Sequence, residues 1–196
     1  MLIQRLISND QARYRYMNRK VNYQAKFLAP FGLLGIRCDD AALSALEFLS
    51  AGAAVGWQRS CRVPTGVLFA GAAAQAHTPL AREVCRQLAA YFSDAAFQFD
   101  LPLHLTGTAH QTKVWQVIRD IPTGRTRQYG ELATLLHSSA RAVGGACGTN
   151  PIPIVIPCHR VLSKSGLGGF MQQRNGSALD IKRWLLSHEQ RSNSVS

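Results

Sequence analysis

The sequence predicts an α+β protein, with an α/β N-terminal lobe followed by a helical C-terminal domain. Short strand-like segments and one amphipathic helix precede Pro102, whereas capped helical patterns dominate after Thr108. The length of 196 residues suits one or two small domains with a real hydrophobic core. We therefore expect an extension at residues 1–22, an N-terminal domain at 23–104, a second domain at 105–190 and a flexible tail at 191–196.

The first part of the chain, residues 1–22, is polar, basic and weakly periodic, and we interpret it as an extension. Residues 26–30 and 32–37 then predict two short strands around a proline and a glycine. The apolar run at residues 41–49 follows two aspartates that can cap or turn the chain. Its spacing predicts a helix.

The rest of the N-terminal lobe contains a long span rich in glycine and alanine, residues 51–76, in which residues 67–69 are a strand candidate. Residues 79–92 predict a helix, because a proline occupies the first position and apolar residues recur on one face. Apolar and polar residues alternate over residues 97–101, which is typical of a half-buried strand. Pro102 ends this pattern, so the domain boundary is expected shortly after it.

Two short helices joined by a tight turn are predicted in the C-terminal half. Before them, Thr108 can cap a helix, with Gln111 at the third position of a capping box. Residues 131–137 and 140–147 then favour two helices separated by a pair of serines. This arrangement is typical of a helix-turn-helix.

The second of these helices has one face of small residues. Ala142, Gly145, Ala146 and Thr149 share that face, and Arg141 stands at the start of the helix. Glycine disfavours a helix by about 1 kcal/mol relative to alanine, so glycines here need a physical reason. Either another protein helix packs closely on this face, or the face enters a narrow site such as the minor groove of DNA, which is about 6 Å wide.

A proline-framed segment, residues 150–160, is the feature around which the chain is organised. Its centre, residues 152–156, is apolar and β-branched and is interpreted as a short buried strand. That strand would place Cys158 at its exit, next to His159 and Arg160. Because nearby positive charge lowers a thiol pKa, and the thiolate is the nucleophile, we interpret Cys158 as a reactive nucleophile rather than an inert buried cysteine.

The last predicted helix covers residues 180–189 and has an apolar face that includes Trp184 and Leu185. Glu189 lies at the margin of this face. A carboxylate in that position is either a surface acid or a buried partner for an imidazole. His159 is the candidate partner.

The net charge of +11 is typical of a protein that meets nucleic acid or another anionic surface. Residues 101–196 carry 11 basic and 4 acidic side chains, so the excess is mostly C-terminal. Five cysteines, with no CxxC pair, argue against a disulfide framework and against a cysteine-rich zinc site. No run approaches the roughly 20 apolar residues of a membrane helix, and no signal peptide is evident. We expect a protein of the reducing cell interior.

The motifs described above resemble those of the O6-alkylguanine-DNA alkyltransferases, which are suicide repair proteins that remove alkyl groups from guanine. The resemblance is strongest from residue 107 to residue 189, whereas residues 23–106 match in outline only. The matching motifs are Gly107-Thr108, Val114-Trp115, Ile121-Pro122-Thr123-Gly124, Tyr129-Gly130, Arg141-Ala142-Val143-Gly144, Asn150-Pro151, Ile156-Pro157-Cys158-His159-Arg160-Val161 and Trp184-Leu185-Leu186. The resemblance implies a ribonuclease-H-like N-terminal domain, followed by a winged helix-turn-helix-type domain that binds DNA and holds the active site.

The resemblance also implies catalytic roles. Cys158 would accept the alkyl group permanently, His159 would take the thiol proton through a water, and Glu189 would orient and stabilise the imidazole. Tyr129 would donate a proton or hydrogen bond to the guanine. Backbone groups at Cys158 and Val161 would read the edge of the base.

Binding is expected to involve base flipping, because O6 of guanine lies inside the duplex. Arg141 would fill the space that the base leaves, and the small residues Ala142, Gly144 and Gly145 would enter the minor groove. Asn150 would brace the turn before the active-site strand. The implied partner is double-stranded DNA containing O6-alkylguanine, bound by a monomer, with or without cooperativity, in the cytoplasm or nucleus. No cofactor, metal or membrane is implied.

Three other functions fit parts of the pattern. A protein that binds damaged DNA without transfer would carry another residue in place of Cys158. A transcription regulator would need Asn, Gln and Arg on its recognition helix, where this helix has glycine and alanine. A Cys-His hydrolase is disfavoured, because neighbouring side chains diverge along an extended chain.

Overall fold

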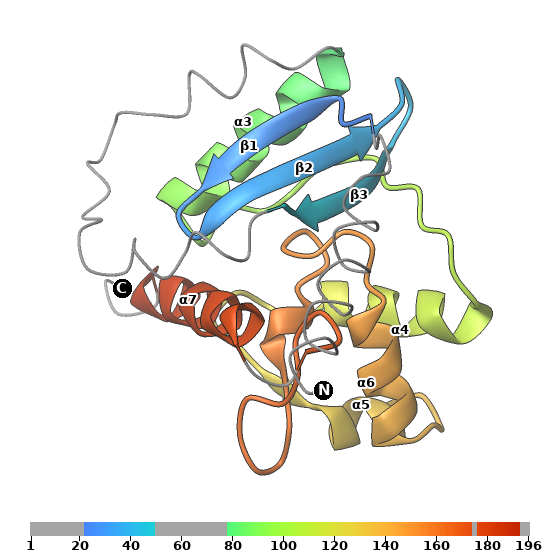
Figure 1. Cartoon of the computed structure of the whole chain (residues 1–196). Helices are drawn as coiled ribbons and strands as arrows, with labels where there is room; N and C mark the ends of the chain where they lie inside the picture. The colour runs from blue at the N-terminus through green and yellow to red at the C-terminus, as the bar shows by residue number, and fades with distance from the viewer. Residues whose placement is uncertain (1–21, 50–77, 174–175, 193–196) are drawn as a thin grey trace, which may run out of the picture.

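The computed structural model describes residues 22–49, 78–173 and 176–192, which form two lobes packed against each other (Figure 1). The described residues of the N-terminal lobe form a sheet and a long helix, and those of the C-terminal lobe are mainly helical, so the expected α+β class is confirmed. The strand expected at residues 67–69, and residues 1–21 of the extension expected at 1–22, lie outside the described residues. No helix in the described part of the chain is long and apolar enough to cross a membrane.

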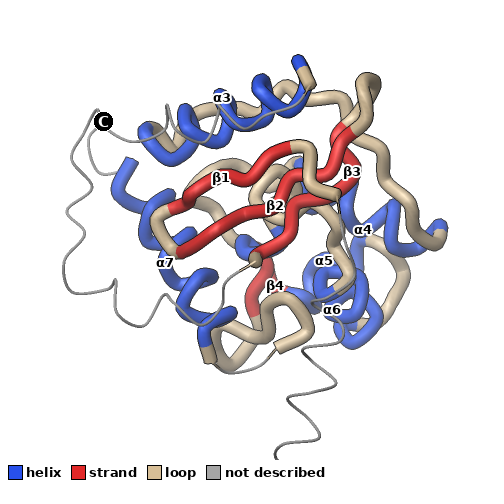
Figure 2. The backbone as a smooth tube through the Cα atoms, turned by 45° about the horizontal axis from the view of Figure 1, so that its top comes forward, coloured by secondary structure: helices blue, strands red, loops and turns tan. Residues whose placement is uncertain are grey.

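The N-terminal sheet is antiparallel, in the order β1-β2-β3. Strands β1 (Ala25–Ala29) and β2 (Gly32–Cys38) form where the sequence predicts two strands. Phe27 pairs with Leu34 across them, and both side chains are fully buried. Helix α3 (Pro79–Ser93), also as predicted, packs along one face of this sheet (Figure 2).

The third strand, β3 (Leu43–Phe48), lies within residues 41–49, so the helix expected there is wrong. Asp39 Oδ1 accepts hydrogen bonds from the backbone N–H groups of Ala41 (2.8 Å) and Ala42 (2.7 Å). This turn brings the chain back antiparallel to β2. The apolar spacing suits either element, and pairing with β2 decides in favour of the strand.

Residues 97–101 form no strand, in contrast to the prediction. The Gln87 side-chain amide donates to Asp100 O (2.7 Å) and accepts from Asp100 N (2.8 Å). Farther along, Leu103 makes an isolated parallel bridge with Leu43. A buried side chain therefore supplies the hydrogen bonds that a neighbouring strand would otherwise give.

The C-terminal lobe is built largely from helices. Its elements are α4 (Ala109–Arg119), β4 (Arg127–Gln128), α5 (Tyr129–Leu135), α6 (Ala140–Gly148), the 3-10 helix η2 (Cys158–Arg160), β5 (Val161–Leu162) and α7 (Ser177–Ser192). The capping box before α4 is complete, because Thr108 Oγ1 accepts from Gln111 N and Gln111 Oε1 accepts from Thr108 N. Helices α5 and α6 form the predicted helix-turn-helix, and β4 pairs in parallel with β5.

The segment at residues 152–156 is buried, as expected, but it is a turn and not a strand. Ile156 N donates to Ile152 O (2.9 Å), and Ile154 has a φ of 78°, so the chain folds back on itself. The prolines in and beside the segment lack the N–H groups that a ladder needs, which favours this closed turn. Cys158 therefore begins η2 instead of following a strand.

Contacts between the lobes hold the elements that carry the site. Trp184 of α7 lies edge-on to the rings of Phe31 (5.4 Å between centroids) and Phe92 (5.8 Å) in the N-terminal lobe. In addition, Leu46 N of β3 donates to Pro151 O (2.9 Å). The N-terminal lobe thus braces both α7 and the turn that precedes η2.

The α4 cap gives a test of the local signals. Thr108→Ala removes the capping hydroxyl, and we expect the free energy of unfolding in urea to fall by about 1 kcal/mol. Thr134→Ala is the matched control, because Thr134 is exposed inside α5 and its hydroxyl donates to Gly130 O of the same helix. Equal losses in the two variants would contradict the capping role.

Candidate active site

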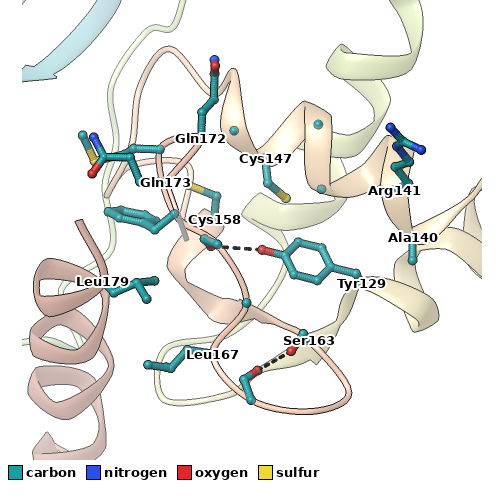
Figure 3. Close-up of a pocket in the computed structure, with 18 of the residues that line it drawn as sticks. Tyr129, Ala140, Arg141, Cys147, Cys158, Ser163, Leu167, Gln172, Gln173 and Leu179 are labelled. Atoms are coloured by element: carbon teal, nitrogen blue, oxygen red, sulfur yellow. Dashed lines mark hydrogen bonds between the residues drawn. The ribbon is translucent and has the colours of Figure 1, made fainter. Parts of the chain in front are cut away.

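A cavity of about 1040 Å³ opens between α5, α6, η2 and the loop that follows β5 (Figure 3). Cys158 lies on its wall with 4% of its surface exposed. Tyr129, at the first position of α5, and Arg141, near the start of α6, also line the cavity. A second thiol, Cys147 of α6, points into the same space. The fold therefore brings together candidate residues that lie far apart in the sequence.

Asn150 joins the turn to the thiol. Its side-chain amide donates to Ile156 O (2.8 Å) and to Cys158 Sγ (3.1 Å). Its Oδ1 accepts from Ile152 N (3.0 Å). One side chain thus closes the buried turn and fixes the position of the sulfur.

The environment of Cys158 differs from the prediction. Burial raises the pKa of its thiol, and the Asn150 hydrogen bond and the charge of Lys182 only partly oppose this. His159 and Arg160, expected to lower that pKa, turn away toward Glu189 instead. They point away from Cys158 because all three residues lie on η2, a helix of about three residues per turn, in which consecutive side chains diverge by roughly 120°. The resting group is a thiol, and a base must remove its proton.

His159 is placed to be that base. Its Nε2 lies 2.8 Å from Glu189 Oε1, and both side chains are at most 1% exposed. Burial lowers the pKa of His159 despite the carboxylate, so the ring is neutral. An ionised carboxylate can only accept, which puts the proton on Nε2 and leaves a lone pair on Nδ1. That Nδ1 is buried and has no hydrogen-bond partner within the described part of the chain.

Glu189 is a buried partner and not a surface acid, which settles the alternative left open by the sequence. Arg160 binds both of its oxygens, through Nε to Oε2 (2.9 Å) and Nη2 to Oε1 (2.8 Å). The Tyr91 hydroxyl donates to Oε1 (2.9 Å) and Gly124 N to Oε2 (3.3 Å). Burial alone would raise the pKa of Glu189, but the hydrogen bonds from His159 and Arg160, together with the Arg160 charge, outweigh it and lower the pKa. Glu189 is therefore ionised.

Sequence reasoning missed a buried lysine beside the cavity. Lys182 Nζ donates to the carbonyls of Val161 (2.7 Å), Leu167 (2.7 Å) and Gly169 (3.1 Å). Burial lowers its pKa to about 8. Its signal was its place on α7, because Lys182 shares a helical face with Leu185 and Glu189. It ties β5 to the cavity loop.

Tyr129 faces that loop. Its hydroxyl donates to Gly169 O (3.2 Å), and burial raises its pKa, so the phenol is neutral. Gly168 has a φ of 70°, and a Cβ there would lie 2.8 Å from the Tyr129 ring. Glycine is therefore required at this close approach. The backbone N–H of Cys158 donates to Ile156 O, and that of Val161 donates to Cys158 O. Of the backbone groups of Cys158 and Val161, only the carbonyls can therefore bind a ligand.

The small face of α6 is open. Arg141, Ala142 and Gly145 are exposed, and no atom of the described residues lies within 4 Å of a Cβ built on Gly145. Gly144 is half-buried, and a Cβ there would lie 4.0 Å from the Tyr129 ring. Ala146, placed on the same face by the sequence, is buried, and its carbonyl accepts from the Trp115 indole (2.8 Å). Helix α4 therefore contacts this face at Ala146 and Thr149, and the part of the face at Ala142 and Gly145 is left open by the described residues.

Comparison with known sequences gives consistent matches. Residues 109–191 match a family model described as 6-O-methylguanine DNA methyltransferase, DNA binding domain. The chain is 38% identical over 169 residues to a methylated-DNA–protein-cysteine methyltransferase of Mycolicibacterium paratuberculosis, covering 83% of this chain and 89% of the relative. It is 36% identical over 172 residues to the constitutive enzyme of that name from Bacillus subtilis, covering 86% and 96%.

Solved structures agree. The crystal structure of Mycobacterium tuberculosis O6-methylguanine methyltransferase superposes with a TM-score of 0.64 at 32% identity, covering 85% of this chain and 92% of that one. The same organism's protein in complex with DNA gives a TM-score of 0.61 at 33% identity, with the same coverage. These matches include the N-terminal lobe.

Glu189→Gln tests the buried ion pair. The folded pKa of Glu189 lies below its unfolded value of about 4.3, so its contribution to stability is present above that pH and is lost as the pH falls through the folded pKa. We expect Glu189→Gln, which leaves Arg160 without its counter-charge, to lose about 3 kcal/mol at neutral pH. The difference from the original protein should narrow in acid, as followed by urea unfolding.

Glu83→Gln is the control, because Glu83 pairs with Arg86 on the surface of α3. Exposed pairs contribute about 0.5 kcal/mol, so this variant should change little. A Glu189→Gln deficit that stayed constant from neutral to acid pH would show that Glu189 does not act through its charge.

Proposed function

This chain belongs to the methylated-DNA–protein-cysteine methyltransferase family, and we propose that Cys158 is the cysteine that accepts the alkyl group. The protein binds DNA and repairs O6-methylguanine directly, by transfer of the methyl group to a cysteine. The observation that carries the assignment is the geometry at η2. Cys158 faces a cavity, and the next residue, His159, is buried and paired with Glu189.

Transfer is a displacement at carbon. Cys158 Sγ forms a bond to the alkyl carbon while the bond from that carbon to O6 breaks, and the electron pair leaves with guanine. The thiol proton passes to His159 Nδ1 through a water, and Glu189 stabilises the imidazolium that results. The thioether formed is stable, so one protein molecule repairs one lesion. The reaction consumes no cofactor.

Guanine must be made a better leaving group. Tyr129 is a neutral phenol at the cavity wall, and we assign it the hydrogen bond to the departing base. Its present acceptor, Gly169 O, belongs to the cavity loop and would be exchanged for the base. The carbonyls of Cys158 and Val161 retain a lone pair each and suit the exocyclic amine of guanine. Asn150 keeps the sulfur in line.

The lesion must leave the duplex to reach this cavity. The open face of α6, with Ala142, Gly144 and Gly145, fits a minor groove, and Arg141 stands at the cavity rim to fill the vacated space. The net charge of +11 supports binding to the backbone in any sequence. The proposed partner is therefore double-stranded DNA with O6-alkylguanine. The protein would bind it as a monomer, in the cytoplasm or the nucleus.

The first test is mass spectrometry after mixing the protein with a duplex that contains one O6-methylguanine. We expect a single added methyl group on the peptide carrying Cys158, with the reaction ending at one equivalent. Cys158→Ala should keep DNA binding and lose transfer. Methyl found on the Cys147 peptide would make the acceptor assignment wrong, and lesion binding without modification would favour a damage-binding protein.

Arg141→Ala separates base flipping from chemistry. We expect it to slow repair of the duplex by at least tenfold and to leave reaction with free O6-benzylguanine nearly unchanged, because the free base needs no flipping. Arg125→Ala is the control, since Arg125 is an exposed cation that does not line the cavity. Equal loss on both substrates would rule out the proposed role of Arg141.

A further inference from the structure

The catalytic carboxylate is bound from the N-terminal lobe. Tyr91 of α3 is 1% exposed, and its hydroxyl donates to Glu189 Oε1 at 2.9 Å. This is the same oxygen that faces His159 Nε2 at 2.8 Å. A side chain 98 positions away in the sequence therefore shares the oxygen that orients the base.

Tyr91 is itself held firmly. Its carbonyl accepts from His188 Nε2 (2.8 Å), the residue that precedes Glu189 on α7. Its ring lies 5.3 Å from the rings of both Phe99 and His188, between centroids. Burial raises the pKa of the phenol, and the Glu189 charge raises it further, so the hydroxyl remains a donor. Two consecutive residues of α7 thus bind one residue of α3.

The position of this hydroxyl has a chemical consequence. A carboxylate oxygen that accepts several hydrogen bonds has its charge dispersed, so it attracts an imidazolium less strongly. The charged and titratable groups around His159 are Glu189 and Lys182 from α7, Arg160 and Cys158 from η2, and Tyr91 from α3 through Glu189. Of these, Tyr91 is the neutral donor whose removal leaves every formal charge in place.

We propose that Tyr91 is a positioning residue for alkyl transfer: from the N-terminal lobe, its hydroxyl binds the Glu189 oxygen that faces His159 and limits how strongly Glu189 retains a proton on the imidazole. This inference rests on the proposed function of Cys158 and His159. It gives the N-terminal lobe a part in the reaction, although every residue assigned to the chemistry lies in the C-terminal lobe.

The test compares two variants of the full chain that each remove one hydrogen bond between α3 and α7. Tyr91→Phe removes the hydroxyl that binds Glu189 and keeps the ring. His188→Phe removes the donor to the Tyr91 carbonyl, keeps a ring against Trp184 and leaves Glu189 untouched. For both, single-turnover transfer is measured from mildly acidic to mildly alkaline pH, with the O6-methylguanine duplex and with free O6-benzylguanine.

We expect Tyr91→Phe to move the acidic limb of the rate profile to higher pH on both substrates. Without the hydroxyl, Glu189 holds the imidazolium more strongly, so the pKa of His159 rises and more of the base is protonated at a given pH. The rate near neutral pH should fall severalfold and recover as the pH is raised. His188→Phe should leave the limb in place, even where its melting temperature falls as far as that of Tyr91→Phe.

Two results would overturn the inference. One is an unshifted limb in Tyr91→Phe, and the other is the same shift in both variants, which would indicate lobe packing alone. Failure of the proposed function would look different, because the original protein would then carry no methyl group on Cys158.

Discussion

The buried charge of Glu189 is the constraint on which the structure depends. A carboxylate removed from water is costly unless hydrogen bonds and opposite charge replace its hydration. Here the replacements come from three places: η2 supplies His159 and Arg160, α3 supplies Tyr91, and the loop after α4 supplies Gly124 N–H. All three must be in position together, so the same interactions that permit the charge also fix the base beside Cys158.

Helix α7 carries a second buried charge on the same face. Lys182 binds three backbone carbonyls beneath the cavity loop, while Glu189, farther along, binds the base. One helix therefore positions both the wall of the cavity and the group that accepts the thiol proton. The aromatic contacts of Trp184 with the N-terminal lobe hold this helix in place, although no described residue of that lobe lines the cavity.

Local signals predicted the elements whose hydrogen bonds are local. The Thr108–Gln111 capping box, the proline start of α3 and the serine turn before α6 each act within a few residues, and those helices formed as expected. The three wrong elements depend on contacts that their apolar patterns do not indicate. Residues 41–49 pair with β2, residues 97–101 bind Gln87, and residues 152–156 close on themselves because their prolines cannot join a ladder.

By itself, the sequence determined that a cysteine, a histidine and an arginine adjoin in one proline-framed segment, and that a helix-turn-helix with a face of small residues precedes this segment, because those signals lie in short contiguous motifs. It also placed Glu189 at the edge of an apolar face. Only the tertiary structure decided that Glu189 is buried against His159, and that Arg160 neutralises Glu189 and does not activate Cys158. Tyr91 and Lys182 likewise acquired their partners from elements far away in the chain. Burial and charge pairing are properties of assembled elements, and no local pattern encodes them.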